Sequence, residues 1–248
     1  MDLYRRQELH SNHLANLVPE HDEQVWRFVS SMTGQRMVMD WQSGKLSLAK
    51  LVEREKRLAR RANQNLEWKW YEALDQTGEL AAQLTKAQYE ADDLETFMVV
   101  SIDRLTMPAT GLKVLRANSF ADLSIVFGLQ EKIWQQPMSE RLQAAYESWL
   151  HDPQAVSYFW VEIDGTPVSS AWIGYTEQSQ FAGLWAGSTL PDYRGRGCYL
   201  ALINARAQEA KKRGVKYLTI DAASSSEAIV KPMGFEALSL TRPYTYSG

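Results

Sequence analysis

Apolar residues in the first hundred positions recur at two different spacings. In residues 20–31 and 46–65 they lie three and four positions apart, which predicts two helices, the second heavily charged on its other face. Residues 66–71 alternate between apolar and polar side chains and predict a strand. A further helix is expected from residue 77 towards residue 88, and the apolar run 95–102 predicts another strand.

The pattern restarts after residues 103–111, which lack periodicity and contain Pro108 and Gly111 as breakers. Beyond this predicted linker, strands are expected at 112–116, 156–163, 168–175, 180–190, 215–221 and 237–246, and helices at 119–134, 138–150, 198–213 and 225–233. Asp164-Gly165 between two alternating runs predicts a β-hairpin. The order from residue 112 onward is therefore β-α-α-β-β-β-α-β-α-β.

Length and composition narrow the class of protein. The 248 residues, 45% of them hydrophobic, suffice for one large domain or two small ones. The single cysteine excludes an intramolecular disulfide framework and a cysteine-based zinc cage, and we expect no metal. The chain starts without the apolar core of a signal peptide, and no run approaches the ~18 apolar residues of a membrane span. We expect a soluble, cytoplasmic protein with no membrane partner.

Charge is distributed unevenly along the chain. The whole chain has 27 basic and 30 acidic residues, a net charge of −3 that argues against a protein whose whole surface binds nucleic acid. We expect no nucleic-acid partner, and binding of nucleic acid through a local basic patch is the least favoured alternative. Residues 191–216 nevertheless contain seven basic and two acidic side chains, a local net charge of +5. Gly195 and Gly197 in this segment precede a predicted helix, whose unpaired N–H groups and dipole favour an anion such as phosphate. The alternative is that the two glycines only form a tight turn.

Two common phosphate-binding motifs do not fit this turn. A P-loop requires a lysine and a hydroxyl residue directly after its last glycine, and Gly197 is followed by Cys198 and Tyr199. A dinucleotide-binding turn requires a third small residue where this chain has Leu200, and it follows an early βαβ unit rather than an antiparallel meander.

The turn does resemble another motif. Residues 191–197, Pro-Asp-Tyr-Arg-Gly-Arg-Gly, resemble the [RQ]-x-x-G-x-[GA] signature of the Gcn5-related N-acetyltransferases (GNAT). The predicted order of elements from 112 to 246 resembles the fold of that family, and Gly234-Phe235 matches its recurring Gly-Phe after the last helix. The last motif position is Tyr199 instead of Gly or Ala, so its ring must turn away from a bound pyrophosphate. The resemblance implies an α+β fold with a mixed, mostly antiparallel sheet flanked by helices, and the pattern of the first hundred residues predicts a smaller helical or α+β domain before it.

The resemblance also implies acetyl-CoA as co-substrate, held in a slot where the strand at 217–221 splays from the strand at 180–190. The backbone at the end of the latter strand would bind the pantetheine arm, the helix N-terminus would bind the pyrophosphate, and a serine would replace the family's asparagine. The implied cofactor-binding residues are Gly187, Ser188, Thr189, Arg194, Gly195, Arg196, Gly197, Cys198, Tyr199, Leu200 and Ser224.

Candidates for acid–base catalysis are fewer. Asp221 at the end of a strand and Glu162 before a turn are candidate general bases, and the alternatives are a helix cap and an exposed strand position, respectively. The tyrosine that serves as acid in many relatives falls on Val230, and Tyr175 is a further candidate acid. Cys198 at a helix N-terminus is either a thiol with a lowered pKa or, as we favour, a buried inert residue.

Three tryptophans, Trp160, Trp172 and Trp185, lie on consecutive predicted strands. Each belongs either to the core or to one wall of a pocket for the acetyl acceptor.

The first hundred residues contain a weak internal repeat. Residues 86–91 resemble residues 231–237 with one deletion, and both follow a predicted strand and helix. Residues 1–105 are therefore interpreted as a degenerate, truncated GNAT-like copy before a complete domain at 112–248. The alternative is an unrelated helical domain.

The sequence thus predicts an N-acetyltransferase that moves an acetyl group from acetyl-CoA directly to an amine of a small molecule or peptide. The alternative is a catalytically silent acyl-CoA-binding regulatory module. The acceptor and the oligomeric state are not determined by the sequence.

Overall fold

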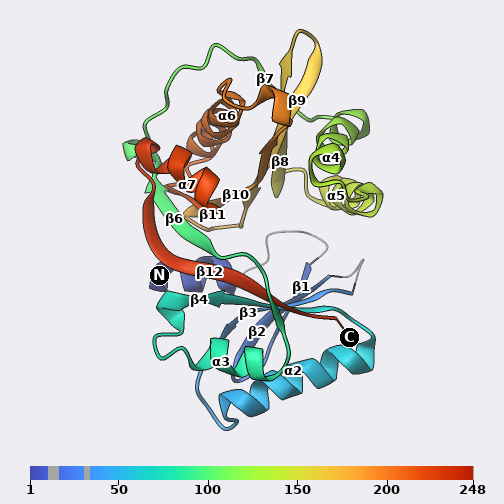
Figure 1. Cartoon of the computed structure of the whole chain (residues 1–248), viewed down its shortest axis with the longest axis vertical. Coiled ribbons are helices and arrows are strands. Elements are labelled where there is room, and N and C mark those ends of the chain that lie inside the picture. Colours follow the sequence, from blue (N-terminus) through green and yellow to red (C-terminus); the bar gives the residue numbers. More distant parts are fainter. Residues whose placement is uncertain (11–16, 31–33, 248) are drawn as a thin grey trace.

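The computed structural model describes residues 1–10, 17–30 and 34–247, and the strands of these residues join in one continuous sheet (Figure 1). The N-terminal half contains, in order, α1 (Asp2–Tyr4), η1 (Arg5–Leu9), β1 (Leu17–His21), β2 (Val25–Ser30), β3 (Arg36–Trp41), α2 (Leu48–Ala62), β4 (Leu66–Tyr71), η2 (Glu72–Leu74), α3 (Glu79–Lys86), β5 (Glu90–Ala91), β6 (Glu95–Ser101) and η3 (Ile102–Arg104). Among the described residues, no helix is long and apolar enough to cross a membrane.

The C-terminal half follows the order expected from the sequence. It contains β7 (Val114–Arg116), α4 (Phe120–Trp134), α5 (Ser139–His151), β8 (Val156–Ile163), β9 (Thr166–Tyr175), β10 (Phe181–Thr189), η4 (Pro191–Tyr193), α6 (Cys198–Lys212), β11 (Tyr217–Ala222), α7 (Ser224–Val230), η5 (Lys231–Met233) and β12 (Glu236–Tyr246). The fold is α+β with a mixed, mostly antiparallel sheet, as predicted.

Local sequence explains several of these boundaries. The Ser119 side chain accepts a hydrogen bond from the Asp122 amide and caps the start of α4. Asp164 and Gly165 both have positive φ and connect β8 to β9 as the predicted two-residue hairpin turn. Gly214, with φ of +77°, follows the end of α6.

The two halves of the sheet repeat the same pattern of strand pairing. In the N-terminal half β1, β2 and β3 form an antiparallel meander, and β3 pairs in parallel with β4. In the C-terminal half β8, β9 and β10 form an antiparallel meander, and β10 pairs in parallel with β11. A helix connects the parallel pair in both halves, namely α2 and α6.

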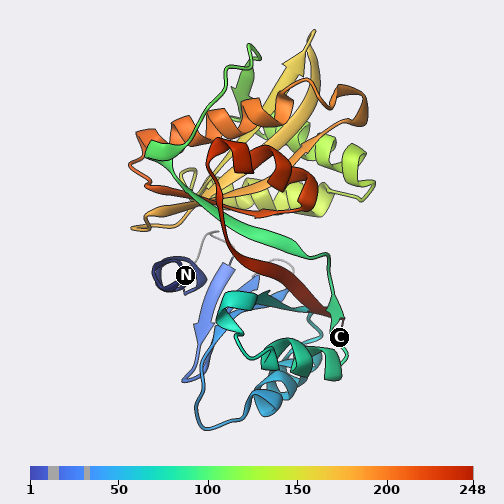
Figure 2. The ribbon, with the colours of Figure 1, turned by 60° about the vertical axis from the view of Figure 1, so that its left-hand side comes forward.

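Each half places its last strand beside the parallel strand of the other half. The strand β6 pairs with β11, β12 pairs with β4, and β6 and β12 also pair with each other. Figure 2 shows green β6 and red β12 side by side between the two halves. The halves are therefore joined by exchanged strands rather than by the linker alone.

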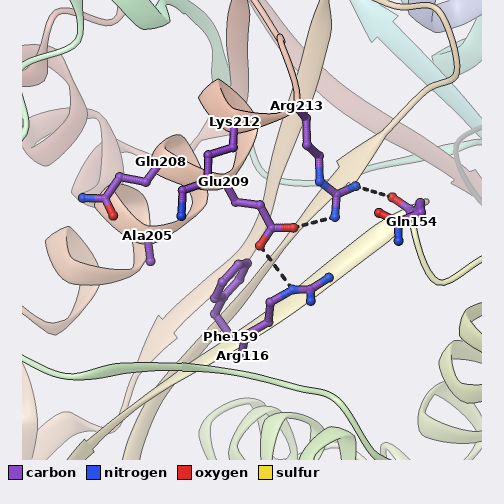
Figure 3. Close-up of a pocket in the computed structure, with 8 residues that line it drawn as sticks. All are labelled: Arg116, Gln154, Phe159, Ala205, Gln208, Glu209, Lys212 and Arg213. Carbon is purple, nitrogen blue, oxygen red and sulfur yellow. Dashed lines mark hydrogen bonds and ion pairs between the residues drawn. The ribbon is translucent and has the colours of Figure 1, made fainter.

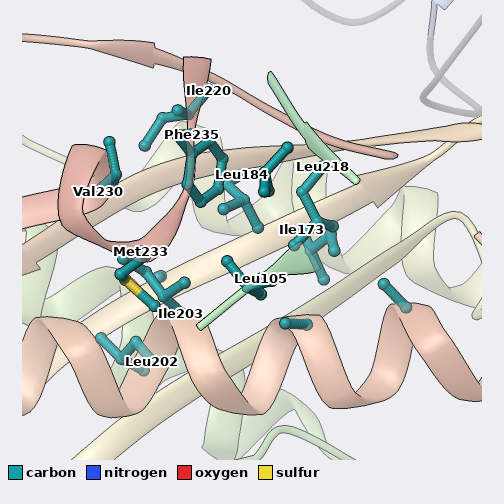
Figure 4. Packing of buried hydrophobic residues seen from close by; sticks show 14 of the residues in the cluster. Leu105, Ile173, Leu184, Leu202, Ile203, Leu218, Ile220, Val230, Met233 and Phe235 are labelled. Carbon is teal, nitrogen blue, oxygen red and sulfur yellow. The ribbon is translucent and has the colours of Figure 1, made fainter. Parts of the chain in front are cut away.

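Hydrophobic clusters lie on defined faces of this sheet. Leu202 and Ile203 of α6 pack with Leu218, Ile220 and Met98 in the largest cluster, part of which Figure 4 shows. A second cluster lies between α2, α3 and the strands β3, β4 and β12, and a third lies under α4 and α5. The N-terminal segment contributes Tyr4 to a fourth cluster of mainly aromatic residues.

The predicted helix at residues 20–31 is wrong, because its described residues form β1 and β2 instead. The register of β2 against β3 shifts at Met39 of β3, because Trp26 is opposite Asp40 whereas Arg27 is opposite Val38. Along β2 residues on both faces are buried, so Val25 and Phe28 are both buried although they lie three positions apart, a spacing that also occurs on one face of a helix. Ser31, the last residue of the predicted helix, lies outside the described residues.

Candidate active site

The parallel strands β10 and β11 separate after a short paired stretch. They pair from Phe181 with Tyr217 to Gly183 with Thr219, although β10 continues to Thr189 and β11 to Ala222. Beyond these pairs, each strand has backbone N–H and C=O groups turned towards the gap, which suits hydrogen bonds to an extended ligand. This gap between the diverging strands, called the slot below, is the splay that the sequence led us to expect.

A bulge shapes the β10 side of the slot. The register of β10 against β9 shifts between Trp185 and Ser188, and Ala186 has φ of +50°. The buried Gln130 amide of α4 donates to the Ala186 carbonyl at 2.9 Å, and Arg206 of α6 donates to the Trp185 carbonyl at 3.4 Å. Two side chains from opposite faces therefore hold the bulge in place.

Neither of these two residues was singled out from the sequence. Gln130 carries no motif, and Arg206 was counted among the basic residues of a phosphate-binding segment. Arg206 is instead only 1% exposed, and burial lowers its pKa to about 10. Its role is to fix backbone carbonyls, which sequence spacing does not reveal.

The turn after β10 has the geometry of an anion site. Gly195 and Gly197 have φ of +75° and +80°, and Gly197 is the residue before α6. The first intrahelical bond of α6 runs from the Ala201 amide to the Gly197 carbonyl, so the preceding amides are outside the helical ladder. Arg194 and Arg196 are exposed here, and Arg194 donates to the Thr189 carbonyl at 3.2 Å.

Tyr199 turns its ring back against β10. A Cβ built on Gly187 would lie 2.4 Å from Cε2 of Tyr199, so the ring covers Gly187 at closest approach. This orientation leaves the Tyr199 amide at the first turn of α6 with the ring directed away from the turn. Leu200 is the next residue of that turn.

The other predicted strand residues make internal contacts. The Ser169 hydroxyl donates to the Ser188 carbonyl at 2.7 Å and lies 2.8 Å from Oγ1 of Thr189. Ser224 is the exposed first residue of α7, which follows β11 directly.

Cys198 is buried at the first position of α6, and its Sγ lies 3.9 Å from the Tyr193 carbonyl. Burial raises the pKa of the thiol, and the opposing effects of a backbone hydrogen bond and of Arg196 are smaller. The alternative of a thiol with a lowered pKa is therefore wrong, and Cys198 is a packed residue.

Asp221 lies at the far end of β11 on one defined face of the sheet. Its neighbours Leu218 and Ile220 point into the cluster under α6, so Asp221 points to the opposite side. We call this side of β4, β12, β6 and β11, away from α2, α3, α6 and α7, the Asp221 face. Oδ2 of Asp221 lies 2.8 Å from Nζ of Lys69 on β4, with side chains 9% and 10% exposed.

The Lys69–Asp221 ion pair shows that the sheet curls over this face. Two strands, β12 and β6, separate β4 from β11. In a flat sheet the two backbones would be about 14 Å apart, which is more than these side chains span together. The Asp221 face is therefore concave, and residues from both halves meet on it.

Glu162 lies elsewhere. It is opposite Pro167 beside the β8–β9 hairpin, and Trp160 Nε1 donates to its Oε1 at 2.9 Å. Tyr175 is also removed from the slot, because it stacks on Arg213 near the end of α6, where burial raises its pKa. Val230 is fully buried in the cluster under α6.

The tryptophans divide between core and surface. Trp160 is buried and Trp172 is partly buried in the cluster under α4 and α5. Trp185 is 42% exposed, and its indole covers Gly183, the last paired residue of β10. An exposed aromatic side chain therefore lies at the mouth of the slot.

Two other basic residues of 191–216, Lys212 and Arg213, line a different place. A cavity of about 380 Å³ lies along the C-terminal half of α6, lined by Lys212, Arg213 and Arg116 among others (Figure 3). Glu209 in this cavity pairs with Arg213 at 2.5 Å and with Arg116 at 3.2 Å. The expectation that the whole basic segment faces one phosphate site is therefore wrong, because α6 separates its two ends by about 20 Å.

Comparison with known proteins agrees with the fold. Residues 123–235 match the model of the acetyltransferase (GNAT) family. An uncharacterised N-acetyltransferase of Methanocaldococcus jannaschii is 31% identical over 99 residues, which cover 37% of this chain and 44% of that protein.

Two solved structures resemble nearly the whole chain. A GCN5-related N-acetyltransferase from Kribbella flavida aligns over 100% of this chain and 94% of its own, with a TM-score of 0.72 and 13% identity. A tandem GNAT protein from the clavulanic acid biosynthesis pathway covers 90% of this chain and 78% of its own, with a TM-score of 0.62 and 14% identity. The chain therefore has the GNAT fold.

Proposed function

We propose that this protein, with its GNAT fold and family match over residues 123–235, is an N-acetyltransferase that moves an acetyl group from acetyl-CoA directly to an amine of a small molecule or peptide. The observation that carries the proposal is the slot between β10 and β11 leading to the glycine turn at the start of α6. An extended arm with a pyrophosphate at one end fits this combination of open strand edges and a helix N-terminus.

The cofactor-binding residues follow from this placement. The pyrophosphate would receive hydrogen bonds from the amides between Gly195 and Leu200, with Arg194 and Arg196 supplying positive charge. The pantetheine arm would lie along β10 at Gly187. The hydrogen bonds of the Ser169 hydroxyl with Ser188 and Thr189 would fix the backbone of β10 beside the arm. Ser224 at the start of α7 would contact the arm from the β11 side.

The acceptor amine would reach the thioester from the Asp221 face. Trp185 and Asp221 lie on this side of the slot, and a carboxylate there attracts an ammonium group. Of the two predicted bases we therefore retain Asp221 at the acceptor and assign Glu162, which lies beside the β8–β9 hairpin, no direct role.

We further propose that residues 1–105 are a degenerate GNAT-like copy and that 112–248 are the working one. Apart from the two-residue strand β5, β1 to β6 follow the order β-β-β-α-β-α-β that β8 to β12 also follow, with the same parallel pair, which supports the proposal. In the N-terminal half the loop before α2 is closed by Gln24, whose side chain donates to the Leu46 carbonyl and accepts from the Leu46 amide. A Cβ on Gly44 of that loop would lie 2.7 Å from the Gln24 side chain, which therefore packs directly against this glycine.

A silent acyl-CoA-binding module is the second candidate function. The observation that favours it is Val230, a fully buried apolar side chain at the position where many relatives carry the acid. This candidate predicts cofactor binding without turnover.

Calorimetry with acetyl-CoA and thiol release with a panel of amines test both functions. We expect Gly195→Asp to weaken acetyl-CoA binding at least 10-fold, because a carboxylate would repel the pyrophosphate. Gly214→Asp is the matched control, since both glycines have φ near +75° and nothing within 4 Å of an added Cβ. Equal losses in the two variants would contradict the phosphate site, and binding without thiol release from any amine would favour the silent module.

A further inference from the structure

The strand β6 brings a carboxylate of the N-terminal half to the Asp221 face. Asp221 pairs with Phe97 of β6, so the two side chains share a face. Glu95 is two residues from Phe97 and therefore lies on the same face, diagonal to Asp221. On its other side Glu95 is opposite Thr241 of β12, which is in turn opposite Tyr71 of β4.

Asp221 already has a partner. Its Oδ2 binds the Lys69 ammonium at 2.8 Å, and both side chains are nearly buried. A carboxylate in a buried pair of this kind is held in place by its counter-ion, and removing either member leaves an uncompensated charge. Asp221 can therefore attract and orient an acceptor, but the ion pair with Lys69 fixes the position of its carboxylate.

Glu95 is the adjacent carboxylate that lies partly open to solvent. The charged groups that face it are Asp221 on β11, Lys69 on β4, and Asp92 and Asp93 on the segment before β6. Burial raises the pKa of Glu95, the charge of Asp221 raises it further, and Lys69 opposes both effects. Glu67 on β4 shares the face but lies nearer the N-terminal half, opposite Thr245, and receives a hydrogen bond from Gln35 at 3.4 Å.

Building on the proposed function, we propose that Glu95 is the catalytic base that takes the proton from the acceptor ammonium, and that Lys69 is a positioning residue that holds Asp221 beside it. Both residues thus come from the N-terminal half, Glu95 on β6 and Lys69 on β4, and both would act at the slot of the C-terminal half.

The three protons of the acceptor ammonium go to three different places in this step. Glu95 takes one proton from the ammonium, and the nitrogen lone pair attacks the thioester carbonyl carbon. The C–N bond forms and the C–S bond breaks, a second nitrogen proton passes to the leaving thiolate, and the third remains on the amide. Glu95 then returns its proton to water.

Glu95→Gln tests the base directly. We expect kcat to fall about 10²-fold and the acidic limb of the pH profile of kcat/KM to disappear, while the affinity for acetyl-CoA stays unchanged. Glu90→Gln on β5 is the matched control, because Glu90 is an exposed strand carboxylate of the same half. A Glu95→Gln enzyme with unchanged kcat would overturn the inference and leave the proposed acetyl transfer standing.

Lys69 is tested through the pH profile. Lys69→Met removes the charge that opposes the raised pKa of Glu95, so the acidic limb moves to higher pH, and Lys69→Arg moves it back. Loss of folding stability alone would lower the amount of active enzyme and leave the limb where it was, which would contradict the positioning role.

A titration independent of turnover separates this inference from the proposed function. In protein labelled with ¹³C at the glutamate carboxyl carbons, the Glu95 signal is the one missing from Glu95→Gln. We expect it to titrate above the ordinary range of a glutamate. Titration at or below that range overturns the assignment of Glu95, whereas failure of acetyl-CoA to bind overturns the proposed function alone.

Discussion

At the scale of single residues, the contact between Gly187 and Tyr199 links the slot to the phosphate turn. A side chain at position 187 would lie 2.4 Å from the tyrosine ring, so Gly187→Ala must push the ring out towards the turn. We expect acetyl-CoA affinity to fall about 10-fold and the free energy of unfolding to fall by about 1–3 kcal/mol. Calorimetry and chemical denaturation measure the two effects.

A second substitution identifies the cause of that loss. In the double variant Gly187→Ala with Tyr199→Ala the displaced ring is absent, so acetyl-CoA affinity should recover towards that of Tyr199→Ala alone. Additive losses in the double variant would show that the two residues do not act through this contact.

Glu8 makes the stability of the protein depend on pH. This buried side chain of the N-terminal segment binds the hydroxyls of Ser179 and Thr176, and burial raises its pKa to about 7. A carboxyl group whose pKa is higher in the folded than in the unfolded protein stabilises the fold fully below the unfolded pKa, about 4.5. That contribution is lost as the pH rises through about 7.

The shift corresponds to at most about 3 kcal/mol between pH 4.5 and pH 8. In Glu8→Gln this part of the pH dependence should vanish, because the amide does not ionise. Urea denaturation of both proteins across this range gives the comparison. Parallel stability curves for wild type and Glu8→Gln would show that Glu8 titrates normally.

Sequence motifs located residues of the candidate site only where the backbone conformation requires a particular residue type. The positive φ angles of Gly195 and Gly197 explain why the turn before α6 could be located from the sequence. Gln130 and Arg206 act on carbonyls of a bulge, Lys69 meets Asp221 only through sheet curvature, and Glu95 lies near Asp221 only because β6 pairs with β11. No spacing along the chain encodes such contacts, so these residues could not be predicted.

At the scale of elements, helices and strands were predicted correctly where the spacing of apolar residues and the positions of Gly and Pro indicated the same boundaries. From residue 112 onward every expected helix and strand is present, and α2, β4, α3 and β6 are where their patterns placed them. In the first forty residues, β2 has buried residues on both faces, and the ion pairs with Asp22 and Glu55 allow Arg27 to be one of them, which obscures the alternation typical of strands. The failure there has a physical cause in a strand that is buried on both faces and in a buried charge.

At the scale of the whole molecule, strand exchange makes the two halves depend on each other. The cluster under α6 contains Met98 and Val100 of β6, and the cluster under α2 contains Tyr244 of β12. Exchange of this kind cannot be predicted from local patterns, because β6 and β12 have the same alternation whichever sheet they join. The division at residues 105 and 112 therefore separates the two halves along the chain only, because the hydrophobic clusters contain strands from both halves.

This dependence predicts how the protein responds to cutting and truncation. Residues 106–109 of the linker are exposed, so a protease site inserted there should be cleaved without loss of structure. The two fragments should stay together on size-exclusion chromatography, because β6 remains paired with β11 and β12 with β4.

Residues 106–248 expressed alone lack β6, which leaves β11 with an unpaired edge and the cluster under α6 open. We expect this fragment to aggregate, and co-expression with residues 1–105 to restore a soluble complex with native circular dichroism. A cleaved protein whose fragments separate in native buffer would show that the exchanged strands do not hold the halves together.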